Sequence, residues 1–269
     1  MHRGRSGHRP DRGGDVVIDL NGLHVLVTGG SRGVGAAACR LFARAGATVL
    51  VHYRDREEEA SALIEELFAV SARDHRRFPC DFMEPSEIEE LFQFVASEWG
   101  KLDCLVNNAG IWLHNPMSQF DEDRYIATMR VNVRGPFLCL RHALPLLRLS
   151  KHASVVNVSS TSGQRGEPYY SPYSASKGAI ISATKAWAAE LGPEIRVNCV
   201  APGWVDTDMS AAALRDDPAV REEIESAIPL RRVANAEDIA GPILFLASPL
   251  ARHITGEIVN VNGGSVLCG

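Results

Sequence analysis

The feature that most constrains the fold is a glycine-rich segment at residues 28–35, which reads T-G-G-S-R-G-V-G. The apolar run 23–27 before it is typical of a buried strand, and the pattern of 36–46 after it is typical of a helix. A turn between a strand and a helix directs free backbone N–H groups and the positive end of the helix dipole at one point, which suits a phosphate. The spacing G-x-x-x-G-x-G differs from the G-x-G-x-x-G of other dinucleotide folds. A tight turn would explain the glycines alone, but their place between a strand and a helix favours a nucleotide site.

Strand-like and helix-like patterns alternate along the rest of the chain. Strands are expected at 23–27, 47–51, 78–80, 102–106, 154–158, 195–200 and 257–261. Helices are expected at 57–70, 86–99 (opened by a Ser86–Glu89 capping box), 122–149 and 172–191, with a last one capped by Asn235 and Asp238. Strands joined by single helices predict an α/β, doubly wound parallel sheet of about seven strands, a Rossmann-type fold with helices on both faces. Without a repeat or linker, 20–269 is predicted to be one domain that includes both the cofactor and the substrate sites.

The first residues differ in character from this domain. Residues 1–14 contain four arginines and one aspartate, whereas the whole chain has a net charge of −5. Their low apolar content predicts that residues 1–19 form a disordered Gly/Arg-rich tail. The arginines have no aromatic residues between them, so the tail does not predict a nucleic-acid partner.

Composition excludes several other classes of protein. No apolar run approaches the roughly 20 residues of a membrane span, so no membrane association is predicted. The six cysteines include no C-x-x-C pair, which predicts reduced thiols in a cytoplasmic protein and no metal site.

A second pattern, Tyr173 with Lys177, places a phenol and an ammonium on one face of the helix expected from residue 172. Pro172 suits the first turn of that helix, and Ser171 suits its cap. A phenol has an ordinary pKa of about 10, and a nearby cation lowers that pKa toward the range in which proton transfer is efficient. Alone, the pair would equally be a half-buried tyrosine beside a solvated lysine.

Taken together, the motifs of this chain resemble those of a known family. Neither the glycine-rich segment nor the Tyr173–Lys177 pair shows this resemblance alone. The motifs are, in order, Thr28-Gly29-x-x-x-Gly33-x-Gly35, Asp81, Asn107-Asn108-Ala109-Gly110, Asn132, Ser160, Tyr173-x-x-x-Lys177, Asn198-x-x-x-Pro202-Gly203-x-x-x-Thr207, Ile254-Thr255-Gly256 and Val261-Asn262-Gly263-Gly264. This set, over about 20–264, resembles the classical short-chain dehydrogenase/reductases, with Asn262 as a departure where Asp is commoner. The resemblance implies a nicotinamide cofactor and reversible carbonyl/alcohol chemistry on a small molecule.

The resemblance also assigns roles to single residues. Family spacing selects Ser160 among neighbouring serines to hydrogen-bond the substrate carbonyl, with Tyr173 as the group that donates or accepts the hydroxyl proton. Lys177 is expected to hold the nicotinamide ribose and to lower the pKa of Tyr173, and Asn132 to anchor a water in a proton relay. The residues expected to bind the cofactor are Gly29, Ser31, Arg32, Gly33, Val34, Tyr53, Arg54, Asp81, Asn108, Ala109, Gly110, Tyr173, Lys177, Pro202, Gly203, Val205 and Thr207.

The end of the second strand bears on the choice of cofactor. In the family, an acidic residue there binds the adenosine ribose hydroxyls, and the corresponding residue here is Tyr53. The missing carboxylate removes a repulsion toward a 2′-phosphate, and Arg54 and Arg32 supply guanidinium groups that can bind one. NADP(H) is therefore favoured and NAD(H) is the alternative. Asp55 and the acidic run 57–59 are counter-evidence, expected to project into solvent.

Pro136 follows Asn132 by four residues in the predicted helix 122–149. Because proline has no N–H, the carbonyl of residue 132 would lose its helical partner. Our hypothesis is that Pro136 frees this carbonyl for the proton relay. The alternative is an ordinary proline kink with Asn132 hydrogen-bonded locally.

The substrate is the least constrained feature. Trp112, Leu113, His114, 164–170 and Trp204 are expected to border it, with 208–228 as a lid. The overall sequence pattern, including Thr207-Asp208-Met209, most resembles that of 3-oxoacyl-[acyl-carrier-protein] reductases. Their carrier docking uses two basic positions, of which Lys151 supplies one and 192–194 (Gly-Pro-Glu) does not, so an acyl-carrier protein partner is only half supported.

Three interpretations remain. The favoured one is an NADP(H)-dependent oxidoreductase that reduces a ketone or 3-oxoacyl group to a secondary alcohol, with tyrosine as general acid. The second is an NAD-dependent sugar or secondary-alcohol dehydrogenase. The third is a non-catalytic dinucleotide-binding protein, against which the complete set of catalytic residues argues. The family resemblance also implies a homotetramer or homodimer.

Overall fold

A computed structural model describes residues 18–268 and contains a seven-stranded, all-parallel sheet. The strands are β1 (His24–Val27), β2 (Thr48–Tyr53), β3 (Arg76–Pro79), β4 (Cys104–Asn107), β5 (Ser154–Val158), β6 (Arg196–Pro202) and β7 (Ile258–Val261). Their order in the sheet is β3-β2-β1-β4-β5-β6-β7. Strands are therefore added outward from β1 in one direction as far as β3 and in the other direction from β4 onward, and the doubly wound sheet expected from the sequence is confirmed.

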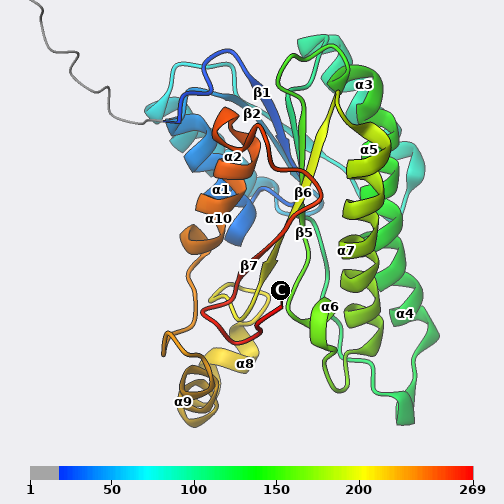
Figure 1. The fold of residues 1–269 in the computed structure, drawn as a ribbon, viewed down its shortest axis with the longest axis vertical. Helices are drawn as coiled ribbons and strands as arrows, with labels where there is room; N and C mark the ends of the chain where they lie inside the picture. Colours follow the sequence, from blue (N-terminus) through cyan, green and yellow to red (C-terminus); the bar gives the residue numbers. More distant parts are fainter. Residues whose placement is uncertain (1–17, 269) are drawn as a thin grey trace, which may run out of the picture.

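Helices cover both faces of this sheet (Figure 1). One layer contains α1 (Gly33–Arg44), α2 (Glu57–Val70) and α10 (Ala236–Ala247). The other contains α3 (Pro85–Trp99), α5 (Gly135–Leu147) and α7 (Ser171–Leu191), with α4 (Glu122–Met129) alongside α7. The short helices α6 (Ser162–Arg165), α8 (Ala211–Arg215) and α9 (Pro218–Ala227) follow β5 and β6.

The near-continuous apolar strands are explained by burial on two sides. Val25 and Val27 of β1 pack into the core shared with α1, whereas Leu26 between them packs into the core shared with α3 and α5. The same alternation holds in β2, where Leu50 faces away from Val49 and Val51. Successive side chains of a strand point to opposite faces, so each strand contributes to both cores.

Two details of the expected helices are wrong. The helix predicted at 122–149 is divided: α4 ends at Met129, a π-helical turn spans Arg130–Arg134, and α5 then begins. The Ser86–Glu89 capping box does not form, because α3 starts at Pro85 with Glu84 as its N-cap and Ser86 lies inside the first turn. The capping box of Asn235 and Asp238 does form, with both of its hydrogen bonds present.

The start of the chain is described from Ile18 onward, so most of the predicted tail (residues 1–17) lies outside the described residues. Ile18 packs against the core, and the backbone N–H of Leu20 donates to the carbonyl of Ala45 at 2.7 Å. Within 18–268, no helix is long and apolar enough to cross a membrane.

Candidate active site

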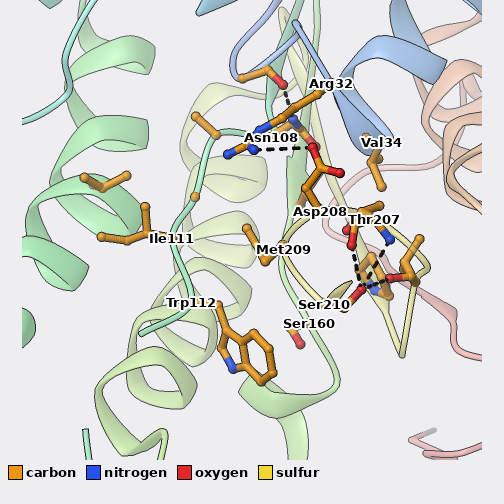
Figure 2. Close-up of a pocket in the computed structure, with 18 of the residues that line it drawn as sticks. Arg32, Val34, Asn108, Ile111, Trp112, Ser160, Thr207, Asp208, Met209 and Ser210 are labelled. Carbon is orange, nitrogen blue, oxygen red and sulfur yellow. Dashed lines mark hydrogen bonds and ion pairs between the residues drawn. The ribbon is translucent and has the colours of Figure 1, made fainter. Parts of the chain in front are cut away.

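One pocket lies at the carboxyl ends of the strands and joins the glycine-rich turn to the start of α7 (Figure 2). Every residue expected to bind the cofactor lies on its wall, as do Ser160, Tyr173 and Lys177. Asn132 is buried just behind it. The sequence did not predict several other residues that line the pocket: His52, Arg56, Cys80, Phe82, Ile111, Val131, Val158, Ser159, Thr161 and Ser162.

The glycine-rich turn leaves no room for side chains at two positions. A Cβ added to Gly35 would lie 2.2 Å from the carbonyl oxygen of Gly29, and Gly29 itself has a φ of +61°. Thr28 and Asn108 fix the turn against the end of β4: the Asn108 Nδ2 donates to the carbonyls of Thr28 (2.9 Å) and Gly29 (3.0 Å). No side chain caps the N-terminus of α1, so its first N–H groups are left for a ligand.

His52 connects this turn to the neighbouring strands. Its Nδ1 accepts a hydrogen bond from the backbone N–H of Gly29 at 2.9 Å, so Nε2 carries the proton and donates to the carbonyl of Cys80 at 2.9 Å. The ring stacks on Phe82 with centroids 4.7 Å apart. Burial lowers the pKa of His52 to about 4, which keeps the imidazole neutral and able to accept this bond. A histidine inside the otherwise apolar β2 was the available signal for this role.

The part of the pocket next to the end of β2 and the glycine-rich turn contains paired charges. Arg54 donates to Asp55 at 2.7 Å, and Arg32 lies 3.4 Å from Asp208 (Figure 2). Asp55 borders the pocket and is exposed, as are Glu57 and the two glutamates after it, so the expected projection of these carboxylates into solvent is confirmed. The Tyr53 hydroxyl accepts a hydrogen bond from Arg77 at 2.7 Å.

Tyr173 and Lys177 are both buried at the other end of the pocket. Burial raises the pKa of Tyr173 to about 12, opposed in part by the nearby Ser160 hydroxyl. Burial also lowers the pKa of Lys177 to about 8, and its Nζ donates to the carbonyl of Val158 at 2.9 Å. The Nζ lies 5.8 Å from the centroid of the Tyr173 ring. The same desolvation shifts both groups toward their neutral forms.

Hydrogen bonds distinguish Ser160 from its neighbours. The Ser159 hydroxyl donates to the carbonyl of Lys177 at 2.8 Å, and the Ser162 hydroxyl donates to Glu167 at 2.5 Å. The Ser160 side chain instead accepts from the backbone N–H of Ser162 at 3.1 Å, and it lies near enough to the Tyr173 phenol to lower its pKa against the effect of burial. Ser160 is thus the serine whose hydroxyl is associated with the phenol.

Asn132 sits in the π-helical turn, and its amide makes three hydrogen bonds. Its Oδ1 accepts from the backbone N–H of Ile111 at 2.8 Å, and its Nδ2 donates to the Ile111 carbonyl (2.9 Å) and to Ser176 (3.1 Å). A Cβ built on Gly110 would lie 3.3 Å from both the Asn132 Oδ1 and the Lys177 Nζ, so the two side chains flank the same glycine. The amide bonds join α7 and the loop after β4, which differs from the local bonding considered as an alternative.

The residues expected around the substrate separate into two groups. Trp112, Trp204, Arg165, Glu167 and the segment 208–210 line the pocket. Leu113, His114, Tyr169 and Tyr170 lie outside its lining, as do α8 and α9, so only the first residues of the expected lid border it.

The chain is similar to known proteins over most of its length. Residues 29–265 match a family model described as Enoyl-(Acyl carrier protein) reductase. The 3-oxoacyl-[acyl-carrier-protein] reductase of Staphylococcus aureus is 37% identical over 240 residues, 89% of this chain and 96% of that protein. A short-chain dehydrogenase/reductase from Brucella melitensis, titled glucose/ribitol dehydrogenase, superposes with a TM-score of 0.88 at 30% identity, covering 94% of this chain and 100% of that one. A blue fluorescent protein from a metagenomic library, solved with NADPH, superposes with a TM-score of 0.86 at 35% identity, covering 93% and 100%.

Proposed function

The chain belongs to the short-chain dehydrogenase/reductase family of oxidoreductases, and on that premise we propose that it reduces a ketone or 3-oxoacyl group to a secondary alcohol with NADPH. One observation carries the proposal: a single pocket joins an uncapped helix N-terminus at the glycine-rich turn to Ser160, Tyr173 and Lys177. The first is a site for a dinucleotide phosphate, and the second is a site for proton transfer to a carbonyl oxygen.

The residues on the pocket wall fit a nicotinamide dinucleotide. The first N–H groups of α1 would hold the pyrophosphate, the neighbourhood of Tyr53 and Arg54 the adenosine, and Lys177 the nicotinamide ribose. Thr207 lies against Gly33, with its Cγ2 3.3 Å from a Cβ built there, so it would border the same ligand near the turn. When bound, the reduced cofactor supplies the hydride for the substrate carbon.

We assign the donation of the proton to Tyr173. Because burial raises its pKa to about 12, the phenol is protonated throughout the neutral range, which is the form that a reduction requires. The Ser160 hydroxyl, which lies near the same phenol, would orient the substrate carbonyl beside it. Lys177 stays positively charged below its pKa of about 8 and would stabilise negative charge that develops on the phenol.

Asn132 contributes to the proposed proton relay by fixing the position of neighbouring groups. Its amide fixes the backbone of Ile111, and its side chain and Lys177 lie on either side of Gly110. A relay through a water near the ammonium is consistent with this arrangement.

The preference for NADP(H) over NAD(H) rests on Tyr53 in place of an acidic residue and on Arg54 and Arg32 beside it. A specific observation keeps NAD-dependent alcohol oxidation as the second candidate: both arginines are already paired, with Asp55 and Asp208. Initial rates with NADPH and NADH at equal concentrations, across ketones, 3-oxoacyl thioesters and sugars, separate the two. Faster turnover with NADH would contradict the NADP(H) assignment.

The role of Tyr173 has a matched control in Tyr170, which precedes α7 and does not line the pocket. Tyr173→Phe should lower kcat by about 100-fold or more, since it removes the general acid. Tyr170→Phe, which keeps the ring, should leave kcat within about threefold, as expected for a site outside the catalytic groups. Equal activity of the two variants would contradict the proposed role.

Light scattering of the purified chain tests the predicted homotetramer or homodimer.

A further inference from the structure

Two tryptophans of the pocket lining, Trp112 and Trp204, form an aromatic wall, and Tyr170, which lies outside the lining, stacks on Trp112. Trp112 follows β4, Tyr170 precedes α7, and Trp204 follows β6. The Trp112 indole stacks on Tyr170 with ring centroids 4.5 Å apart at an interplanar angle of 17°. It meets Trp204 edge to face, with centroids 5.8 Å apart at 86°. Both tryptophans line the pocket that contains Ser160, and Figure 2 shows Trp112 directed toward that pocket.

The backbone that carries Trp112 is fixed on both sides. The Ile111 N–H and carbonyl are both held by the Asn132 amide, at 2.8 and 2.9 Å. On the other side, the Asn115 N–H donates to the carbonyl of Tyr169 at 2.8 Å, and its side chain bonds the backbone of Asp121. The indole is therefore held in place before any substrate arrives.

Trp204 is fixed from a different direction. It packs against a small core formed by Leu214, Ile228 and Val233, and its carbonyl accepts from the N–H of Ala234 at 3.1 Å. The two tryptophans therefore meet as a rigid corner at nearly a right angle, with the exposed side chain of Met209 on the same pocket.

A rigid, flat, apolar corner distinguishes substrates by the shape of the group that contacts it. A planar ring gains offset-stacked or edge-to-face contact with fixed aromatic rings, while an alkyl chain of equal size makes less directed contact and loses rotamer freedom on binding. Residues 162–167 contribute two charged side chains to the pocket lining: Glu167, which already accepts a hydrogen bond from Ser162, and Arg165, which is exposed.

We propose that the substrate is a ketone with an aryl group beside the carbonyl, and that Trp112 is the residue that determines this specificity. The inference rests on the proposed reductase function and narrows its substrate class. It places the aryl group against Trp112 and Trp204 and the carbonyl oxygen toward Ser160 and Tyr173.

The test compares kcat/KM for ethyl benzoylacetate and for its hexyl counterpart, ethyl 3-oxononanoate, with the reduced cofactor that supports turnover. The wild-type protein should prefer the aryl ketone by about 3- to 10-fold, as expected for one stacked ring. Trp112→Leu should abolish the preference mainly through a higher KM for the aryl ketone, and Trp112→Phe should restore part of it.

Trp99→Leu is the matched control, since Trp99 ends α3, stacks on His24 and lies outside the pocket lining. It should leave the ratio unchanged. No preference in the wild type, or an equal loss for both ketones in Trp112→Leu, would overturn the inference.

Failure of the reductase function itself gives a different result, namely no turnover of either ketone. In that case acetophenone binding, followed by quenching of tryptophan fluorescence in the wild type and in Trp112→Leu, still tests the aromatic wall. Equal affinity of the two proteins would overturn the inference, and binding weakened about 3-fold or more in the variant would support it.

Discussion

Lys177 is a buried ammonium that should lower the stability of the fold. It is 5% exposed, and its pKa falls from 10.5 to about 8 because burial penalises the charged form. A tenfold change in proton affinity corresponds to about 1.4 kcal/mol, so the penalty on the ammonium is about 3 kcal/mol. Lys177→Met removes this penalty but also removes the hydrogen bond to the Val158 carbonyl, worth about 1–2 kcal/mol. The variant should therefore be more stable at neutral pH by about 1–2 kcal/mol while losing turnover.

The pH dependence of this difference follows from the two pKa values. Below pH 8, Lys177 is charged in both the folded and the unfolded chain, so the penalty is fully present. Between pH 8 and 10.5 the unfolded chain binds more protons, so the stability of the wild type rises with pH relative to the variant. The advantage of Lys177→Met should therefore shrink across this interval.

Thermal and urea unfolding of the cofactor-free protein at several pH values would measure both effects. At neutral pH the variant should melt about 2–6 °C higher. Lys185→Met, at an exposed site on the same helix, is the matched control and should change stability by less than about 0.5 kcal/mol. A destabilised Lys177→Met, or an advantage that stays constant from neutral pH to pH 10.5, would refute the reasoning.

Three further substitutions test the geometry around the pocket. Gly35→Ala would place a Cβ 2.2 Å from the Gly29 carbonyl oxygen, so we expect about 1–3 kcal/mol of destabilisation by urea unfolding and weaker NADPH binding by titration. His52→Phe removes the acceptor of the Gly29 N–H and should raise the KM for NADPH several-fold with little change in kcat; an unchanged KM would exclude this positioning role. Pro136→Ala restores an N–H that can bond the Asn132 carbonyl and allows the π-helical turn to become α-helical, so kcat should fall by about 10- to 100-fold through misplacement of Asn132. Unchanged turnover and an unchanged pH profile would contradict the Pro136 hypothesis.

The fold was predictable because its signals are local and repeated. Each expected strand is a short apolar run, and burial on both faces of the sheet makes such runs inevitable, as Val25, Leu26 and Val27 illustrate. The interruption at Arg130–Arg134 was not predictable in its form, since α- and π-helical turns share nearly the same apolar pattern. Pro136 indicated an irregularity there without specifying it. The false cap at Ser86 has a similar cause: Pro85 suits the first helical position, and the helix starts there instead.

Trp112, Trp204 and 164–170 were expected around the substrate, but the contacts among their side chains depend on distant segments of the chain. Trp112, Tyr170 and Trp204 follow or precede different elements, and nothing in their separate surroundings predicts that their rings meet. His52 was missed for a related reason. Its partners, Gly29 and Cys80, become neighbours only when β1, β2 and β3 are laid side by side.

The opposite pKa shifts of Tyr173 and Lys177 have one cause, and that cause favours one direction of reaction. Burial raises the pKa of the phenol to about 12 and lowers that of the ammonium to about 8. At neutral pH the phenol is therefore ready to donate a proton, while the ammonium beside it keeps the charge that stabilises a phenolate. Oxidation of an alcohol would need the phenolate before the reaction begins, and burial makes that form rare. These pKa shifts therefore support the proposed reductase function, in which Tyr173 donates the proton, and on that proposal the free-energy cost of burying Lys177 is the cost of holding its charge near Tyr173.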